Sequence, residues 1–227
     1  MQQAASCLML CDVQALLFDL DGTLIDSAPD LGGAANALRQ ERGLAALPLA
    51  VLRPWVGAGA RGMLAAGLSI EPEHPEYLTL RDRFLALYEQ RLLLHTRAFD
   101  GVAEVLALLD RRGLPWGIVT NKAERFTHPI HRGMPLLQSA KAVISGDTTP
   151  QAKPHPEPLL EACRRLGVDP KACAYVGDDL RDVQAAHAAG MRSVAACWGY
   201  LGHGADVASW GAHLRADSPQ ALSDWLT

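Results

Sequence analysis

The sequence predicts an α/β protein with a doubly wound, parallel, Rossmann-like sheet and a small all-helical domain inserted into it. Three observations carry this prediction. Short apolar runs typical of β-strands alternate with helical patterns, the runs lack a polar face, and one connection is far longer than the others. A chain of 227 residues is long enough for one large domain or for a core with a small insert.

Five runs of three to five residues are predicted to be the strands of the sheet. They show no clean alternation of apolar and polar side chains, as expected for strands that helices cover on both faces. Each run follows a helical pattern or opens the chain, which favours parallel pairing. The predicted strands are Ala15–Phe18, Pro115–Val119, Ala142–Ile144, Ala174–Val176 and Ser193–Ala196.

Four helical patterns connect these strands and form the outer layers of the predicted core. The residue after the third of them is Gly167, and glycine also follows the other three, at the position where a helix C-terminus is expected. The predicted helices are Val102–Arg112, Glu124–Arg132, Glu157–Leu166 and Leu180–Ala189.

The first connection is the exception, because residues 19–114 separate the first predicted strand from the second. An ordinary crossover uses far fewer residues, so this segment must contain an insertion. It holds three helical patterns, Asp30–Arg42, Leu49–Leu68 and Pro75–Leu94. Three glycines, at positions 57, 59 and 62, interrupt the second pattern, so part of it is predicted to be a turn.

These patterns predict the domain organisation. The α/β core comprises residues 12–27 and 96–227, a helical cap comprises residues 28–95, and residues 1–11 form a disordered lead-in. The lead-in contains no Lys or Arg before Asp12, so it does not resemble a secretory signal.

Composition and charge exclude several classes of partner. With 21 basic and 25 acidic residues the formal charge is −4, so no polyanion-binding surface is indicated and no nucleic-acid partner is expected. No run approaches the length of a membrane span, so no membrane association is expected. The five cysteines form no CxxC pair and are interpreted as reduced thiols of a cytoplasmic protein. A monomer or a homodimer is expected.

Two carboxylates follow the first predicted strand directly. Asp19 and Asp21 are two residues apart on an extended segment, so their side chains point the same way, and Gly22 comes next. Ligands of open α/β sheets bind beyond the carboxyl ends of the strands, where these side chains would lie. An isolated Asp-Gly pair would be read as a plain turn, but the second acid and its placement favour a site.

The next strand end and a proline-rich segment offer further polar groups. Thr120 and Asn121 follow the second predicted strand and present a hydroxyl, a side-chain amide and backbone N–H groups. Lys153 lies in the run KPHPEP, whose prolines would hold it in a fixed place before a helix. Taken alone, Thr120 could be a helix N-cap and Lys153 a solvated charge.

The fourth predicted strand ends in a cluster of acids, Asp178, Asp179 and Asp182. Helix capping accounts for one or two of them. Beside Asp19 and Asp21, such carboxylates would repel one another, and a hard divalent cation would relieve that repulsion. Ligands that are all oxygen suit Mg²⁺.

In this order, the segments DLDGT at 19–23, Thr120, Lys153 and GDDLRD at 177–182 resemble the four motifs of the haloacid dehalogenase superfamily of phosphohydrolases. The resemblance covers nearly the whole chain from Asp12 onward. The helical segment after the first motif is similar to that superfamily's type 1 cap.

The resemblance implies a role for each residue of the core motifs. Asp19 would be the nucleophile that forms an aspartyl phosphate, and Asp21 would be the general acid and base. The metal Mg²⁺ would be held by Asp19, the backbone carbonyl of Asp21, and Asp178, with Asp182 as an indirect partner. Thr120, Asn121 and Gly22 would contact phosphate oxygens, and Lys153 would offset negative charge. Asp179 need not bind metal.

The cap segment VGAGARGML at 56–64 resembles the glycine-bearing cap turn of phosphoglycolate phosphatases. Arg61 in this segment is predicted to contact a substrate carboxylate, although an exposed arginine on a glycine-loosened helix would look the same in sequence. Arg53, His95 and Arg97 are weaker candidates for that contact.

The most strongly indicated activity is hydrolysis of a small carboxylated phosphate ester, above all 2-phosphoglycolate. The same motifs resemble phosphatases of N-acetylmuramic acid 6-phosphate, whose lactyl carboxylate fits Arg61 equally well. Phosphomutases share the acid at position 21 and the cap type, whereas carbon–halogen hydrolases of the superfamily lack that acid. The alternative outside enzymes is a catalytically silent Rossmann-like binding module.

Overall fold

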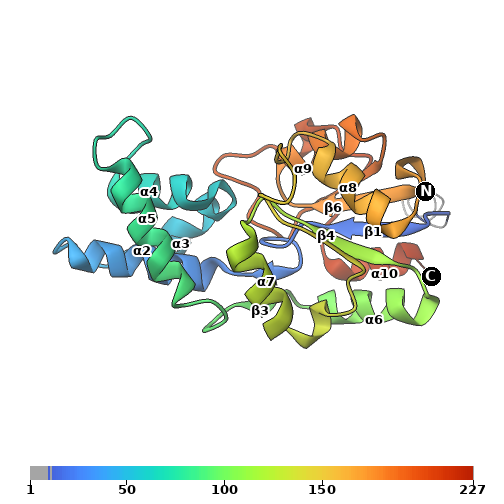
Figure 1. Ribbon diagram of the computed structural model, residues 1–227, viewed down its shortest axis with the longest axis horizontal. Coiled ribbons are helices and arrows are strands. Elements are labelled where there is room, and N and C mark those ends of the chain that lie inside the picture. Colours follow the sequence, from blue (N-terminus) through green and yellow to red (C-terminus); the bar gives the residue numbers. More distant parts are fainter. Residues whose placement is uncertain (1–9, 11, 227) are drawn as a thin grey trace.

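The structure, a computed structural model, describes Leu10 and residues 12–226. Six strands form one sheet in the order β5-β4-β1-β6-β7-β8, and every neighbouring pair is parallel (Figure 1). The strands are β1 Ala15–Phe18, β4 Trp116–Val119, β5 Ala142–Ile144, β6 Cys173–Gly177, β7 Arg192–Ala196 and β8 Leu214–Ala216. The predicted α/β sheet and its five predicted strands are confirmed.

Strand β8 is the element of the sheet that the sequence prediction missed. It has three residues at the sheet edge, and only Ala216 of them is buried. Such a segment has no apolar run to mark it.

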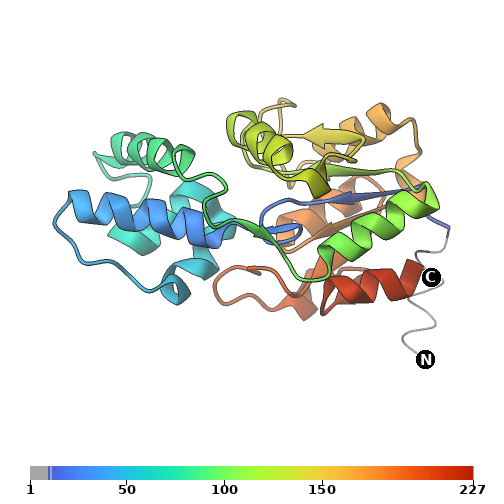
Figure 2. The same ribbon diagram turned by 90° about the horizontal axis from the view of Figure 1, so that it is seen from below.

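Two layers of helices cover the sheet, as the absence of a polar face predicted. In β1, Leu16 and Phe18 pack into the cluster formed with one helical layer, and Ala15 and Leu17 pack into the other cluster. The first layer contains α6 Val102–Arg112, α7 Glu124–Gly133 and α10 Pro219–Leu226. The second contains α8 Glu157–Leu166 and α9 Leu180–Ala188. Figure 2 shows α6 and α10 side by side on the first face.

Short 3₁₀ turns complete the core at Pro135–Leu137, Pro170–Ala172 and Val207–Trp210. The disordered lead-in predicted for residues 1–11 lies outside the described residues except at Leu10, which is buried in the core.

The helical insert, residues 28–95, leaves and re-enters the core through a two-stranded antiparallel ribbon, β2 Ile25–Asp26 and β3 Arg97–Ala98. These strands flank the two predicted boundaries between core and cap. The insert stands at one end of the molecule, away from α10 (Figure 1). Its helices are α2 Ala28–Glu41, α3 Leu49–Leu52, the 3₁₀ turn Arg53–Ala58, α4 Gly59–Leu68 and α5 Tyr77–Glu89.

Two predicted helices of the insert differ from the structure. The pattern at 49–68 is broken as its glycines suggested, because Gly59 has a positive φ of 61° between the 3₁₀ turn and α4. The helix predicted to reach Leu94 ends at Glu89. Beyond it, Leu92 and Leu93 pack against the core, and Leu93 takes a positive φ of 67°, so tertiary packing overrides the helical pattern.

Asp30 connects the segment where the chain enters the insert with the segment where it leaves. Its carboxylate lies at the start of α2 and is fully buried. It accepts hydrogen bonds from the N–H groups of His95 (3.0 Å) and Thr96 (2.9 Å) and from the Thr96 hydroxyl (2.7 Å). The junction is therefore built from side-chain contacts as well as from the ribbon.

Candidate active site

A cavity of about 350 Å³ lies between the carboxyl end of the sheet and the helical insert. Its floor is polar and comes from the core, whereas much of the opposite wall is apolar and comes from the insert. The floor contains Asp19, Asp21, Thr120, Lys153, Asp178 and Asp182. The structure thus brings together the strand-end residues that the sequence singled out.

Lys153 is the centre of the floor, with a side chain only 2% exposed. Its ammonium nitrogen lies 3.0 Å from Asp19 Oδ1 and 2.8 Å from Asp182 Oδ1. It also donates to the Tyr175 hydroxyl (2.6 Å) and lies 3.0 Å from the Val119 carbonyl. These contacts hold the ammonium group of Lys153 in place.

Asp178 is buried next to this group. Its Oδ1 accepts a hydrogen bond from the Thr23 hydroxyl at 3.0 Å, and its Oδ2 accepts one from the Tyr200 N–H at 2.8 Å. These two donors hold the carboxylate toward Asp19 and Asp182, with which it forms a cluster whose oxygens lie within 4.8 Å of one another.

The acids of the cluster carry unfavourable electrostatic energy. Burial raises the pKa of Asp19 to about 6, with neighbouring carboxylates adding to the shift and Lys153 opposing it. Burial and repulsion from Asp19 and Asp182 hold the pKa of Asp178 well above its usual range. One lysine cannot neutralise three buried carboxylates, so the oxygen cluster fits a hard divalent cation.

Asp21 belongs to a second ion pair, which the sequence analysis did not find. Its Oδ2 lies 3.0 Å from the ammonium of Lys122, and its Oδ1 accepts a short hydrogen bond from the Ser27 hydroxyl. Lys122 also donates to the hydroxyl of Tyr88 on α5 at 3.0 Å and sits over that ring. Attraction to Asp21 and Tyr88 outweighs burial and raises the pKa of Lys122.

A third pair connects the fourth motif with the insert. Arg181 donates to both carboxylate oxygens of Asp179, at 2.8 and 2.7 Å, and to the Gly57 carbonyl of the insert at 2.6 Å. Burial opposes ionisation of Asp179, but the guanidinium outweighs it and lowers the pKa of this carboxyl. Asp179 is therefore occupied by Arg181.

The two residues that follow β4, Thr120 and Asn121, have different roles. Thr120 is buried, and its hydroxyl oxygen accepts the Lys122 N–H at 3.1 Å, which leaves the hydroxyl proton to donate into the cavity. The side chain of Asn121, predicted to contact phosphate, instead holds the backbone of Lys153 through two hydrogen bonds of 2.9 Å. The Asn121 backbone N–H is the donor that this arrangement leaves for a phosphate.

Gly22 has a steric role in place of the predicted phosphate contact. Its N–H is donated to the Ile25 carbonyl at 2.9 Å, so this donor is already used. Its φ is +86°, and a Cβ there would lie 2.1 Å from Asp178 Oδ2. Glycine is required because Asp178 approaches the backbone so closely.

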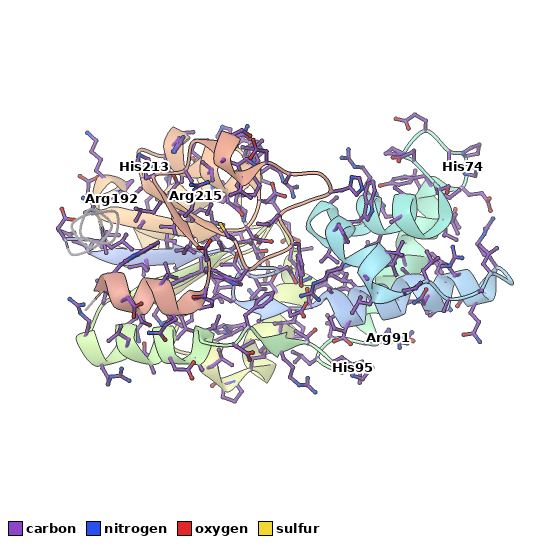
Figure 3. All side chains as sticks on the ribbon, turned by 180° about the vertical axis from the view of Figure 1, so that it is seen from behind. His74, Arg91, His95, Arg192, His213 and Arg215 are labelled. Carbon is purple, nitrogen blue, oxygen red and sulfur yellow. The ribbon has the colours of Figure 1, made fainter. Side chains whose placement is uncertain are left out.

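Arg61 lies outside the cavity lining. Gly59 and Ala60 line the cavity, but the next residue along α4 is exposed. Successive side chains on a helix differ in direction by about 100°, which separates Arg61 from Ala60. The weaker candidates Arg53, His95 and Arg97 do not line the cavity either, and Figure 3 shows His95 at the outer side of the junction, near Arg91.

A family model for haloacid dehalogenase-like hydrolases matches residues 16–196. The chain belongs to this family. The match spans all four motifs and the insert, so the predicted superfamily is confirmed.

Similar proteins carry two different names. The chain is 46% identical over 210 residues to a phosphoglycolate phosphatase of Xanthomonas campestris, covering 92% of this chain and 94% of that protein. It is 39% identical over 214 residues to an N-acetylmuramic acid 6-phosphate phosphatase of Pseudomonas aeruginosa, covering 94% and 95%. The crystal structure of a predicted phosphoglycolate phosphatase from Haemophilus somnus matches with a TM-score of 0.83 at 26% identity, covering 95% of this chain and 99% of that one.

None of the helices in the described part of the chain is long and apolar enough to cross a membrane.

Proposed function

We propose that this protein is a Mg²⁺-dependent phosphomonoester hydrolase that forms an aspartyl phosphate, with 2-phosphoglycolate as its substrate. The observation that carries the proposal is the floor of the cavity. There Asp19 is held by Lys153 at 3.0 Å, next to two further buried carboxylates and below a space open to a small ligand. The names of the relatives support phosphoglycolate as the substrate.

In this proposal Asp19 attacks phosphorus. Its Oδ1 accepts hydrogen bonds from Lys153 (3.0 Å) and from the Leu20 N–H (2.7 Å), which fix the orientation of the carboxylate. The second oxygen, Oδ2, is left to approach the phosphoryl group. A nucleophile fixed in this way has already lost the rotational freedom that attack would otherwise cost.

Asp21 transfers the proton. It lies two residues beyond the nucleophile on the same side of the chain, and Ser27 and Lys122 hold its two oxygens. When it carries a proton, Asp21 donates it to the leaving alkoxide. The carboxylate left behind, paired with Lys122, then takes a proton from the water that hydrolyses the aspartyl phosphate.

The transferred phosphoryl group is held by donors from two strand ends. Thr120 offers its hydroxyl proton, and the Asn121 backbone offers an N–H, while the Asn121 side chain positions Lys153. Lys153 then offsets the negative charge that Asp19 and the phosphoryl oxygens share.

Asp19, Asp178 and the Asp21 backbone carbonyl are the groups proposed to hold Mg²⁺. Asp182 is proposed to act indirectly, because its Oδ1 contacts Lys153 and its Oδ2 accepts the Asp179 N–H. When bound, the ion would supply positive charge that offsets the negative charge of the phosphoryl group.

The helical insert is proposed to be a mobile cap. Leu31, Val56 and Phe84 of the insert line the cavity, so closure over the substrate would exclude bulk water. Opening would then release the products.

N-acetylmuramic acid 6-phosphate is the second candidate substrate, and the cavity volume favours it. About 350 Å³ is within the range of pockets for drug-sized ligands and exceeds what a two-carbon ester fills. The apolar wall could pack against the acetyl and lactyl methyl groups of this sugar.

We further propose a cytoplasmic protein, a monomer or homodimer, whose partner is a small phosphate ester rather than a nucleic acid or a membrane. The net charge of −4 and the free thiols of Cys163, Cys173 and Cys197 support this placement.

The test is phosphate release from both esters, with Mg²⁺ and with EDTA. The proposal expects turnover that requires Mg²⁺ and a higher kcat/KM for phosphoglycolate. Higher kcat/KM for the sugar phosphate would select the second candidate. Conversion to an isomeric phosphate ester, detected by ³¹P NMR, would indicate a mutase. If neither ester is turned over, the proposal is rejected.

A further inference from the structure

We propose that Arg125, at the start of α7, binds the carboxylate of the substrate and thereby determines which phosphate esters are cleaved. The inference rests on the proposed hydrolase function and goes beyond it, because it assigns specificity to a residue of the core rather than of the insert.

Two of the cavity cations are neutralised by acids of the floor. Lys153 contacts Asp19 and Asp182, and Lys122 contacts Asp21 at 3.0 Å. Both lysines are buried in these pairs, so neither is free to bind a second anionic group of a ligand.

Arg181 is occupied as well. Its guanidinium makes two hydrogen bonds to Asp179 and one to the Gly57 carbonyl. These contacts use the Nε and Nη2 donors of Arg181, which would otherwise be available to bind a ligand carboxylate through two hydrogen bonds.

Arg125 is the remaining cation among the described residues that line the cavity. It is exposed, and its guanidinium carbon lies 4.5 Å from the centre of the Phe126 ring. Within the described chain it takes part in no ion pair, whereas Glu124 beside it pairs with His128. The five donors of Arg125 are available for a planar, bidentate contact with a carboxylate.

The position of Arg125 relative to the phosphate site is set by the core. Strand β4 ends at Val119, Thr120 follows it, and α7 begins at Glu124, so Arg125 sits five residues beyond the proposed phosphate donor. Ala123 and Phe126 on either side also line the cavity. Movement of the insert leaves the spacing between Thr120 and Arg125 unchanged.

The apolar wall of the cavity offers a carboxylate no partner. The wall formed by Leu31, Val56, Phe84 and Leu85 is apolar, and a carboxylate buried against it without a partner would be costly. The basic side chains labelled in Figure 3 lie elsewhere, since none of them lines the cavity. They are His74, Arg91, His95, Arg192, His213 and Arg215.

Arg61 provides a matched control. Like Arg125 it is an exposed arginine on a helix near the cavity, but it does not line the cavity. Substitution by glutamine at either position removes one positive charge and keeps a polar side chain of similar length.

The experiment measures kcat/KM for two pairs of substrates in which one member carries a carboxylate and the other lacks the group that bears it. One pair is 2-phosphoglycolate and 2-hydroxyethyl phosphate, and the other is N-acetylmuramic acid 6-phosphate and N-acetylglucosamine 6-phosphate. The proteins are wild type, Arg125→Gln, Arg125→Lys and Arg61→Gln, each checked for unchanged thermal unfolding.

The expected result is a selective loss. Arg125→Gln lowers kcat/KM about 10- to 100-fold for the carboxylated member of whichever pair is cleaved, and less than about twofold for its partner, as for one charged hydrogen-bonded contact. Arg125→Lys loses less, because it keeps the charge without the bidentate geometry. Arg61→Gln changes neither member by more than about twofold.

Two results would overturn the inference while leaving the hydrolase function standing. One is an equal loss on both members of a pair in Arg125→Gln, and the other is a larger selective loss in Arg61→Gln. If wild type releases phosphate from none of the four esters, the proposed function fails and this inference fails with it.

Discussion

Replacement of Lys122 by methionine tests the buried ion pair between Lys122 and Asp21 of the core, whose lysine also contacts Tyr88 of the insert. The side chains of Lys122 and Asp21 are 8% and 16% exposed, and their charged atoms are 3.0 Å apart. The mutation leaves the Asp21 carboxylate without its cation and leaves the Tyr88 hydroxyl without its donor. Methionine has nearly the same length, so packing is largely preserved.

The expected cost follows from these contacts. Breaking a buried pair from one side costs about 3–5 kcal/mol, and the lower end applies because Asp21 faces the cavity and can be partly solvated. A loss of about 3 kcal/mol lowers the melting temperature by about 6–12 °C for a chain of this size. Tyr88→Phe keeps the ion pair and removes one hydrogen bond, so we expect about 1 kcal/mol and about 2–4 °C.

The assay is thermal unfolding followed by circular dichroism at pH 8, where the carboxylate is ionised in the unfolded chain. Lys141→Met is the control, because Lys141 is exposed and forms no ion pair within the described residues. If Lys122→Met melts within about 1 °C of this control, the ion pair contributes nothing and the reasoning is refuted.

Three further predictions address the floor of the cavity. Asp19→Asn should abolish phosphate release on every substrate while the unfolding curve stays cooperative, and residual turnover near the wild-type rate would exclude Asp19 as the nucleophile. Gly22→Ala should lower the free energy of unfolding, measured in urea, by more than about 2 kcal/mol, because the new Cβ would clash with Asp178. Gly43 also has a positive φ, of 71°, but has open space around it, so Gly43→Ala should lower the free energy of unfolding by less. In EDTA, the native protein binds the Asp19 proton more tightly than the unfolded chain, since the pKa is about 6 against an ordinary 3.8. The free energy of unfolding should therefore fall by up to about 3 kcal/mol as pH rises from about 4 to about 6. Asp19→Asn should show a shallower slope, because the raised pKa of Asp178 still contributes. Mg²⁺ should reduce the slope of the wild type, and equal slopes in both proteins would contradict the assigned pKa.

The floor of the cavity could be predicted from sequence because its residues directly follow apolar runs that are recognisable as strands. Asp19, Thr120 and Asp178 each follow an apolar run within three residues, and parallel strands place their carboxyl ends at one edge. Their arrangement depends on backbone topology, which the alternating pattern predicts well. The exact partner of each side chain does not follow from that pattern, as the side chain of Asn121 shows.

Contacts between core and insert could not be predicted, because they join segments that have no fixed relation in sequence. Lys122 stands next to Asn121 in the second motif, and Arg181 lies within the fourth, so both were visible as charges. Their partners, Tyr88 and the Gly57 carbonyl, come from the insert. The prediction that Arg61 faces the cavity was wrong for a related reason. Which side of α4 faces the cavity depends on how the helix packs against the rest of the insert, and the sequence pattern does not give that rotation.

The same contacts bear on how the insert could move. If the insert moves away as proposed, Lys122 would keep Asp21 and lose Tyr88, and Arg181 would keep Asp179 and lose Gly57. Each of these two cations would therefore retain its carboxylate in either position, and opening would break at least these two charge-assisted hydrogen bonds, each with a net worth of about 1.5–3 kcal/mol. That cost is of the same order as the few kcal/mol that separate exchanging conformations. Because the ion pairs stay intact, the floor can remain charged and ordered while the cavity opens for release.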